Sequence, residues 1–139
     1  MFAAIPLLAV PVVIYNLIVF LAAPTDAQVF LTNPLFTIRM PTGAGWSIGL
    51  GDLLLAASLV MLFVELLKST SSGSLAIVNH ALSMVLFVVC LVEFLLLGTF
   101  ATSTFFLITL MVVLDVLAGF IVTIVSARRD IDFDPAGGR

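Results

Sequence analysis

The sequence predicts an all-α membrane protein: a bundle of four transmembrane helices with a short extracytoplasmic β-hairpin between the first and second helices. Of the 139 residues, 63% are hydrophobic and only 9% are charged, whereas soluble domains are about half apolar and a quarter charged. Four stretches are apolar over the roughly 20 residues that a helix needs to cross a bilayer. Between the first two stretches, the residue pattern is typical of two short strands joined by a turn.

The four apolar stretches are expected to be helices, because backbone polar groups in lipid must be paired within their own segment. The first resembles a signal peptide, but it is uncharged over a longer stretch than is normal for one, and we interpret it as a span. The second is the hardest to delimit, since a helix that began only at Asp52 would be short. The predicted spans are residues 2–23, 46–67, 74–97 and 102–126, in one domain of residues 1–127 that is followed by a tail of residues 128–139.

The loop after the first span is the only predicted extramembrane segment with regular structure. Residues 35–40 favour a strand, residues 41–44 a turn, and residues 46–48 a returning strand. We expect this hairpin on the outer face, with Trp46 at the level of the lipid headgroups, where tryptophan is enriched. A re-entrant segment is the alternative.

Positive charges set the expected orientation. Lys68, Arg128 and Arg129 flank one side of the predicted membrane region, and only Arg39 lies on the other. Because cytoplasmic loops carry the excess of Lys and Arg, both termini are expected to be cytoplasmic.

Polar side chains within the spans are the candidate functional residues. Asp115 lies about halfway along the fourth span, where a carboxylate costs about 2.5–3.5 kcal/mol on insertion scales and therefore normally faces protein or water. Gly119 and Thr123 follow at four-residue steps and form a narrow face that another helix can approach closely. Two roles remain open for Asp115: a structural hydrogen bond between helices, or a carboxylate that binds substrate or couples transport to an ion.

The second and third spans each carry a polar stripe at helical spacing. Glu65 lies on the stripe of the second span, together with Ser58 and Leu62. It also precedes Lys68 by three residues, which is typical of a surface ion pair. The stripe of the third span contains Asn79, Ser83, Leu86, Cys90, Glu93 and Leu97.

The depths of these residues in the membrane indicate which of them can meet. At matching depths, Glu65 is expected near His80. Asp115 is expected near Asn16 or Ser83. Glu93 is expected near Arg39 or Asp52.

Several classes of site are not supported by the sequence. The net charge is −3 and the basic residues are scattered, so nucleic-acid binding is not expected. Cys90 is the only cysteine, which excludes an internal disulfide. His80 is a single histidine, so a haem or metal site would need a second copy of the chain, and we expect no metal or cofactor. The alternating Asp130, Asp132 and Asp134 lack the glutamate that completes a calcium loop, and we interpret them as a solvated acidic tail.

Two segments carry a resemblance to known proteins. Residues 46–55 (WSIGLGDLLL), and residues 103–130 with their motifs LDVLAGF and SARRD, resemble small four-helix bacterial inner-membrane proteins of unassigned function. The resemblance implies a bacterial cytoplasmic membrane and no particular chemistry. Small multidrug transporters have a similar size and helix count, but they use a glutamate in the first helix, where this chain has Asn16. Quinone-linked disulfide enzymes need cysteine pairs.

We therefore expect a non-enzymatic structural or accessory protein, surrounded by lipid, that works as a homo-oligomer or as a subunit of a larger membrane complex. The alternative is a small proton- or cation-coupled transporter or channel that uses Asp115 and Glu93. A membrane-embedded enzyme is a third hypothesis, with His80 and Glu65 as acid and base. No nucleophile elbow, HExxH motif, P-loop or dinucleotide fingerprint accompanies these residues.

Overall fold

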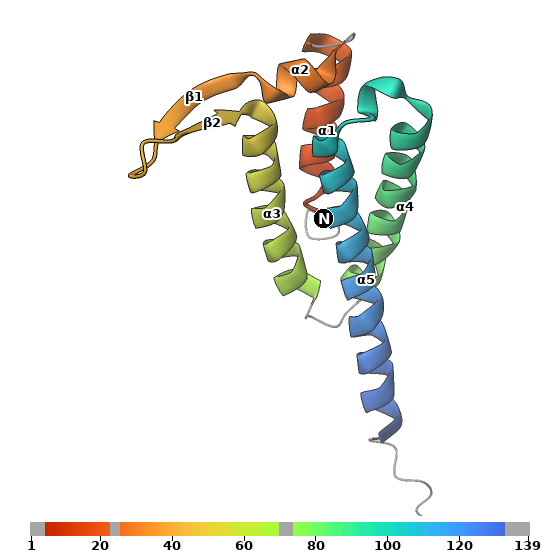
Figure 1. Cartoon of the computed structure of the whole chain (residues 1–139). Helices are drawn as coiled ribbons and strands as arrows, with labels where there is room; N and C mark the ends of the chain where they lie inside the picture. Colours follow the sequence, from red (N-terminus) through yellow and green to blue (C-terminus); the bar gives the residue numbers. More distant parts are fainter. Residues whose placement is uncertain (1–4, 23–25, 70–73, 133–139) are drawn as a thin grey trace, which may run out of the picture.

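The protein is mostly helical in the computed structural model, which describes residues 5–22, 26–69 and 74–132 (Figure 1). Among the described residues, three helices are long and apolar enough to cross a membrane, so this is a membrane protein. Helix α5 contacts the other long helices and α1. The helices that pack together are α1 (Ala9–Leu17), α3 (Leu50–Ser69), α4 (Ser74–Leu96) and α5 (Ser103–Asp132).

The core lies where α1, α3 and α4 meet α5. Tyr15, Leu62, Cys90 and Ile108, one from each of these four helices, are all buried in it. The outward faces of the same helices are covered by exposed apolar side chains such as Phe63, Val85 and Ile121. Exposure of so many apolar side chains to water is unfavourable, so these faces suit contact with lipid.

The first predicted span is only partly a helix. Helix α1 begins at Ala9 and continues into a π-helical turn, η2 (Ile18–Ala22), so the two cover about 20 Å rather than the 30 Å of a bilayer core. Pro11 lies in the first turn of α1, where a residue without an N–H donor is tolerated. A helix that began near residue 2 would place Pro11 in its interior, where proline breaks the hydrogen-bond pattern. Residues 1–4 and 23, which the prediction included, lie outside the described part of the chain.

The start of the second predicted span is wrong. Helix α3 begins at Leu50, because residues 46–49 belong to a strand. The Asp52 side chain closes the helix end by accepting a hydrogen bond from the Gly49 N–H at 2.9 Å, as an acidic residue in the first helical turn commonly does.

The third and fourth predicted spans are helices. Helix α4 ends at Leu96, within a residue of the prediction. A short 3₁₀ turn, η3 (Gly98–Phe100), connects it to α5. Helix α5 continues to Asp132 rather than ending at residue 126, so the predicted tail begins as helix. Residues 133–139 of that tail lie outside the described part.

The predicted hairpin is present. Strands β1 (Pro34–Arg39) and β2 (Gly45–Gly49) pair antiparallel, and Gly43 at the turn has the positive φ of 85° that favours glycine. The hairpin projects sideways from one end of the helices (Figure 1). Beside it lies a short helix that the sequence did not predict, α2 (Ala27–Thr32), which begins where the Asp26 side chain accepts a hydrogen bond from the Val29 N–H at 3.1 Å.

Candidate functional site

The candidate site is a group of polar side chains buried between helices near the end of α3. Glu65 is 0% exposed, and Ser58 and Leu62, which share its helical stripe, are buried as well. The stripe on α3 therefore faces inward, as its spacing predicted.

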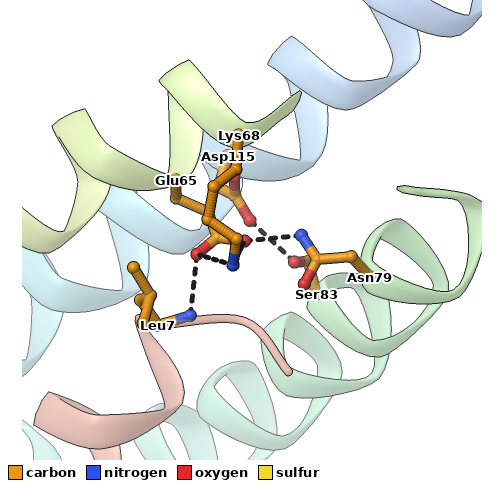
Figure 2. Close-up of polar contacts among 6 residues, drawn as sticks. All are labelled: Leu7, Glu65, Lys68, Asn79, Ser83 and Asp115. Carbon is orange, nitrogen blue, oxygen red and sulfur yellow. Dashed lines mark hydrogen bonds and ion pairs between the residues drawn. The ribbon is translucent and has the colours of Figure 1, made fainter. Parts of the chain in front are cut away.

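The Glu65 carboxylate joins three segments of the chain (Figure 2). It accepts hydrogen bonds from the Leu7 backbone N–H at 2.8 Å and from the Asn79 side-chain amide. It also pairs with Lys68 at 3.3 Å. Leu7 lies just before α1, so the carboxylate stands at the N-terminal end of that helix, where the backbone N–H groups and the helix dipole favour a negative charge.

Two expectations about Glu65 need correction. The ion pair with Lys68 exists, but it is not a surface pair, because Glu65 is fully buried and the Lys68 side chain is 31% exposed. The partner of Glu65 on α4 is Asn79 rather than its neighbour His80. Residues 79 and 80 differ by about 100° around a helix, so only one of them can face α3.

Asp115 pairs with α4 as predicted. Its Oδ2 atom accepts a hydrogen bond from the Ser83 hydroxyl at 2.7 Å (Figure 2). Asp115 is 1% exposed, and its Oδ1 atom has no hydrogen-bond partner among the described residues. We call Glu65, Lys68, Asn79, Ser83 and Asp115 the polar cluster.

His80 lies against α5 rather than α3. A Cβ atom at Gly119 would overlap the His80 imidazole ring, so the absence of a side chain at Gly119 admits the ring. A cavity of about 100 Å³ adjoins this contact, lined by His80, Met84, Val116, Gly119 and Phe120. The close approach predicted at Gly119 therefore occurs within the chain. Thr123 lies in α5, but its side chain falls outside the described part.

A second polar contact lies toward the opposite end of the helices. The Asn16 side-chain amide of α1 donates to the Glu93 carboxylate at 3.2 Å and to the Val12 carbonyl at 3.1 Å. Asn16 is thus the partner of Glu93 and not of Asp115. The predicted partners of Glu93 are placed elsewhere, because Arg39 belongs to the projecting hairpin and Asp52 bonds to Gly49.

The sequence reasoning missed a third contact, between Tyr15 and Thr102. Their hydroxyl groups are 2.6 Å apart, and the Thr102 hydroxyl also accepts a hydrogen bond from the Phe105 N–H at the start of α5. The Tyr15 ring packs on Phe100 and Phe105. Tyr15 is a polar residue within the first predicted span, but its partner is 87 positions away in the sequence. Nothing in the sequence connects the two positions.

The hydrogen bonds of these polar side chains join α3 to α4, α4 to α5, and α3 to the start of α1. Within the described residues, no three His, Cys, Asp or Glu side chains gather as they would around a metal ion.

No protein-family model matches the chain, and neither a curated protein nor a solved structure shows a significant similarity to it. A proposal about function therefore depends on the geometry of the polar groups.

Proposed function

We propose that the chain is a non-enzymatic integral membrane protein that serves as a structural or accessory subunit, in a homo-oligomer or a larger membrane complex. The observation that carries this proposal is the set of contacts made by Glu65. Its carboxylate binds the Leu7 backbone N–H, Lys68 and Asn79 of its own chain. A catalytic acid or base must be within reach of a substrate. Glu65 is instead buried in contacts that hold α1, α3 and α4 together.

The extramembrane part supports the same proposal. Apart from the ends of the helices, the described part of the chain outside the spans consists of the short helix α2, the turn η3 and the hairpin. These segments offer little surface on which to build a soluble catalytic domain. A protein of this shape acts most directly through its helices, on lipid or on other membrane subunits.

Four membrane passes, with both termini cytoplasmic and the hairpin outside, are part of the proposal. The bond between Leu7 and Glu65 brings the start of α1 to the end of α3 that carries Lys68. Helix α1 then runs toward the hairpin end of the molecule, where α2 and η3 also lie (Figure 1). Arg128 and Arg129 belong to the last part of α5, which extends past the end of α3 that carries Lys68, and this supports a cytoplasmic location for that end. The resemblance to small inner-membrane proteins favours the cytoplasmic membrane of a bacterium.

Single cysteines test this topology. Cys90 is the only native cysteine, and Cys90→Ala provides a cysteine-free chain into which Arg39→Cys and Arg128→Cys are introduced separately. A membrane-impermeant maleimide added to intact cells is expected to label the cysteine at 39 and to spare the one at 128 until the membrane is permeabilised. Labelling of both positions from the same side would overturn the proposed number of passes.

The assembly part of the proposal is tested by mass measurement. The protein is extracted with its own lipids into polymer nanodiscs and weighed by native mass spectrometry. We expect several copies, or one copy with a second polypeptide in fixed stoichiometry. A monomer without such a partner would reject the accessory function while leaving the fold unaffected.

One observation favours a second candidate, a proton- or cation-coupled transporter or channel that uses Asp115 and Glu93. The Oδ1 atoms of Asp115 and Asn79 are buried acceptors without a hydrogen-bond partner in the described part of the chain, and acceptors of this kind are suited to a passing cation. The test is flux of protons or sodium into proteoliposomes with the wild type, Asp115→Asn and Glu93→Gln. Absence of flux in all three would remove this candidate, and equal flux in all three would remove the roles of both residues.

A further inference from the structure

Two buried oxygen atoms of the polar cluster have no hydrogen-bond partner among the described residues: Oδ1 of Asn79 and Oδ1 of Asp115. Asn79 is 4% exposed and Asp115 is 1% exposed, so bulk solvent does not reach them. Exchanging the nitrogen and oxygen positions of the Asn79 amide does not give its oxygen a partner. The nitrogen donates to the Glu65 carboxylate, and an oxygen in its place would face another oxygen. Both unpartnered atoms are therefore acceptors.

The side chains that carry the two oxygens are close in the structure. Asn79 and Ser83 are four residues apart on α4 and share a helical face. Ser83 is bonded to Asp115 across the contact between α4 and α5. Figure 2 shows the Asn79 and Ser83 side chains extending from α4, with a dashed line from the Ser83 hydroxyl to the Asp115 carboxylate. The two acceptors thus lie on side chains that are connected through neighbouring positions on α4 and the hydrogen bond between Ser83 and Asp115.

Among the described residues, no ion pair joins Asp115 to a positively charged side chain. Glu65 and Asp115 each carry one negative charge when ionised, and Lys68 supplies one positive charge, which is bound to Glu65 at 3.3 Å. His80 is a titratable side chain near the cluster, and its ring lies against Gly119, which follows Asp115 by four residues. An ionised carboxylate in a helix bundle without a compensating charge is costly in a medium of low dielectric constant.

We propose that the polar cluster binds one monovalent positive charge, a sodium ion or a proton, at the oxygens of Asp115 and Asn79. A proton on Asp115 would turn one acceptor into a donor and leave Asn79 as a suitable acceptor. A sodium ion would take both oxygens, and the Ser83 hydroxyl, as ligands. Divalent cations fit less well, because calcium takes six to eight oxygen ligands, commonly from several carboxylates. In either form, the bound charge neutralises Asp115 and links α4 to α5.

This inference does not depend on the accessory function. A charge that stays bound would strengthen the contact between α4 and α5 in a structural protein. A charge that exchanges with both sides of the membrane would serve a transporter. Binding is therefore tested by itself, without a flux measurement.

The experiment measures the unfolding temperature of the full chain in lipid nanodiscs. Trp46 is the only tryptophan, so its fluorescence is the readout. Sodium chloride is exchanged for choline chloride at constant ionic strength, and a separate series varies the pH. Asp115→Asn is the test variant, because an amide removes the charge and supplies its own N–H donors. Asp26→Asn is the matched control, since Asp26 is exposed at the start of α2, away from the cluster, and asparagine caps a helix about as well as aspartate.

The two forms of the charge give different results. For sodium, the unfolding temperature of the wild type rises with each tenfold increase in sodium and is unchanged by choline. For a proton, the stability of the wild type relative to Asp115→Asn rises as the pH falls, by up to about tenfold in the folding equilibrium constant per pH unit. The comparison with Asp115→Asn isolates the part of the pH response that depends on the Asp115 carboxylate. Asp26→Asn is expected to respond to sodium like the wild type.

The proposal is overturned if the wild type responds to neither sodium nor pH beyond what Asp115→Asn shows, or if Asp115→Asn still responds to sodium. Should Asp115→Asn fail to fold, the wild type alone decides the question. Infrared spectra recorded over the same pH series reveal a protonated carboxylic acid by its C=O stretch, and the sodium titration is repeated on the same samples. Absence of both the band and the sodium response rejects the site.

Discussion

The imidazole ring of His80 lies on the part of α5 where Gly119 leaves room for it, so that any side chain at position 119 would occupy the same space. Gly119→Ala is therefore expected to lower the unfolding temperature, with a cost of about 1–3 kcal/mol from overpacking. Helix propensity alone predicts the opposite, because alanine is favoured over glycine within a helix. The measurement is thermal or SDS-induced unfolding in matched lipid.

A control and a rescue make this prediction specific. Gly98→Ala is the control, because nothing lies within 4 Å of a Cβ atom placed there, and it is expected to be neutral. His80→Ala combined with Gly119→Ala removes the ring that the new methyl group meets. We expect this double variant to recover most of the loss. Equal unfolding temperatures for Gly119→Ala and Gly98→Ala would show that the ring is not held against α5.

Glu65→Gln is expected to destabilise the protein far more than Glu93→Gln. Glu65 is fully buried, and its ionised form suits the Leu7, Lys68 and Asn79 donors around it, whereas Glu93 is half-buried with Asn16 as its partner. We expect a loss of about 3 kcal/mol for Glu65→Gln, at the low end for breaking a buried ion pair because Lys68 is 31% exposed. Equilibrium unfolding in mixed micelles measures both variants, and similar losses would contradict the central place of Glu65.

Thr102→Val is expected to be more harmful than Tyr15→Phe. Tyr15→Phe removes one hydroxyl from a pair 2.6 Å apart, which typically costs about 1 kcal/mol. Thr102→Val removes the same contact and also the hydrogen bond from the Phe105 N–H that caps α5, which adds roughly another 1 kcal/mol. Unfolding free energies of the two variants and of their combination test the order. A loss in Tyr15→Phe equal to or greater than that in Thr102→Val would contradict it.

Trp46 is expected to lie at the lipid headgroups. Strand alternation puts Phe36, Ile38 and Trp46 on one face of the hairpin, with Thr37 and Ser47 on the other, where their hydroxyl groups are 3.1 Å apart. Because β2 leads directly into α3, this apolar face begins where a spanning helix ends. Lipids brominated near the headgroup should quench the fluorescence of Trp46 more than lipids brominated near the chain ends. Quenching by aqueous iodide alone would place the hairpin in water.

The sequence predicted those elements that can be recognised from the residue pattern of a single segment. Helices α4 and α5 follow from the length of their apolar stretches, and the hairpin follows from alternation around Gly43. The start of α3 was wrong because Trp46 and Ile48 are apolar enough for either a helix or a strand, and only pairing with β1 decides between them. Helix α2 was missed because a six-residue helix has too few residues for a periodic pattern.

The contacts of the polar groups were predicted only in part. Matching depths correctly paired Asp115 with Ser83. The same comparison failed for Asn16, Glu93 and Glu65, because depth does not say which helices are neighbours or how each is rotated. Asn79 lay on the predicted stripe of α4, but nothing in the sequence showed that it, rather than His80, would face Glu65.

The polar contacts of α1 have a consequence for how the protein is made. Leu7, Tyr15 and Asn16 bond to residues that lie 58, 87 and 77 positions further along the chain. A ribosome delivers α1 before any of these partners has been made. Helix α1 must therefore wait beside the insertion machinery or in lipid until the start of α5 emerges, and only then can it complete its contacts.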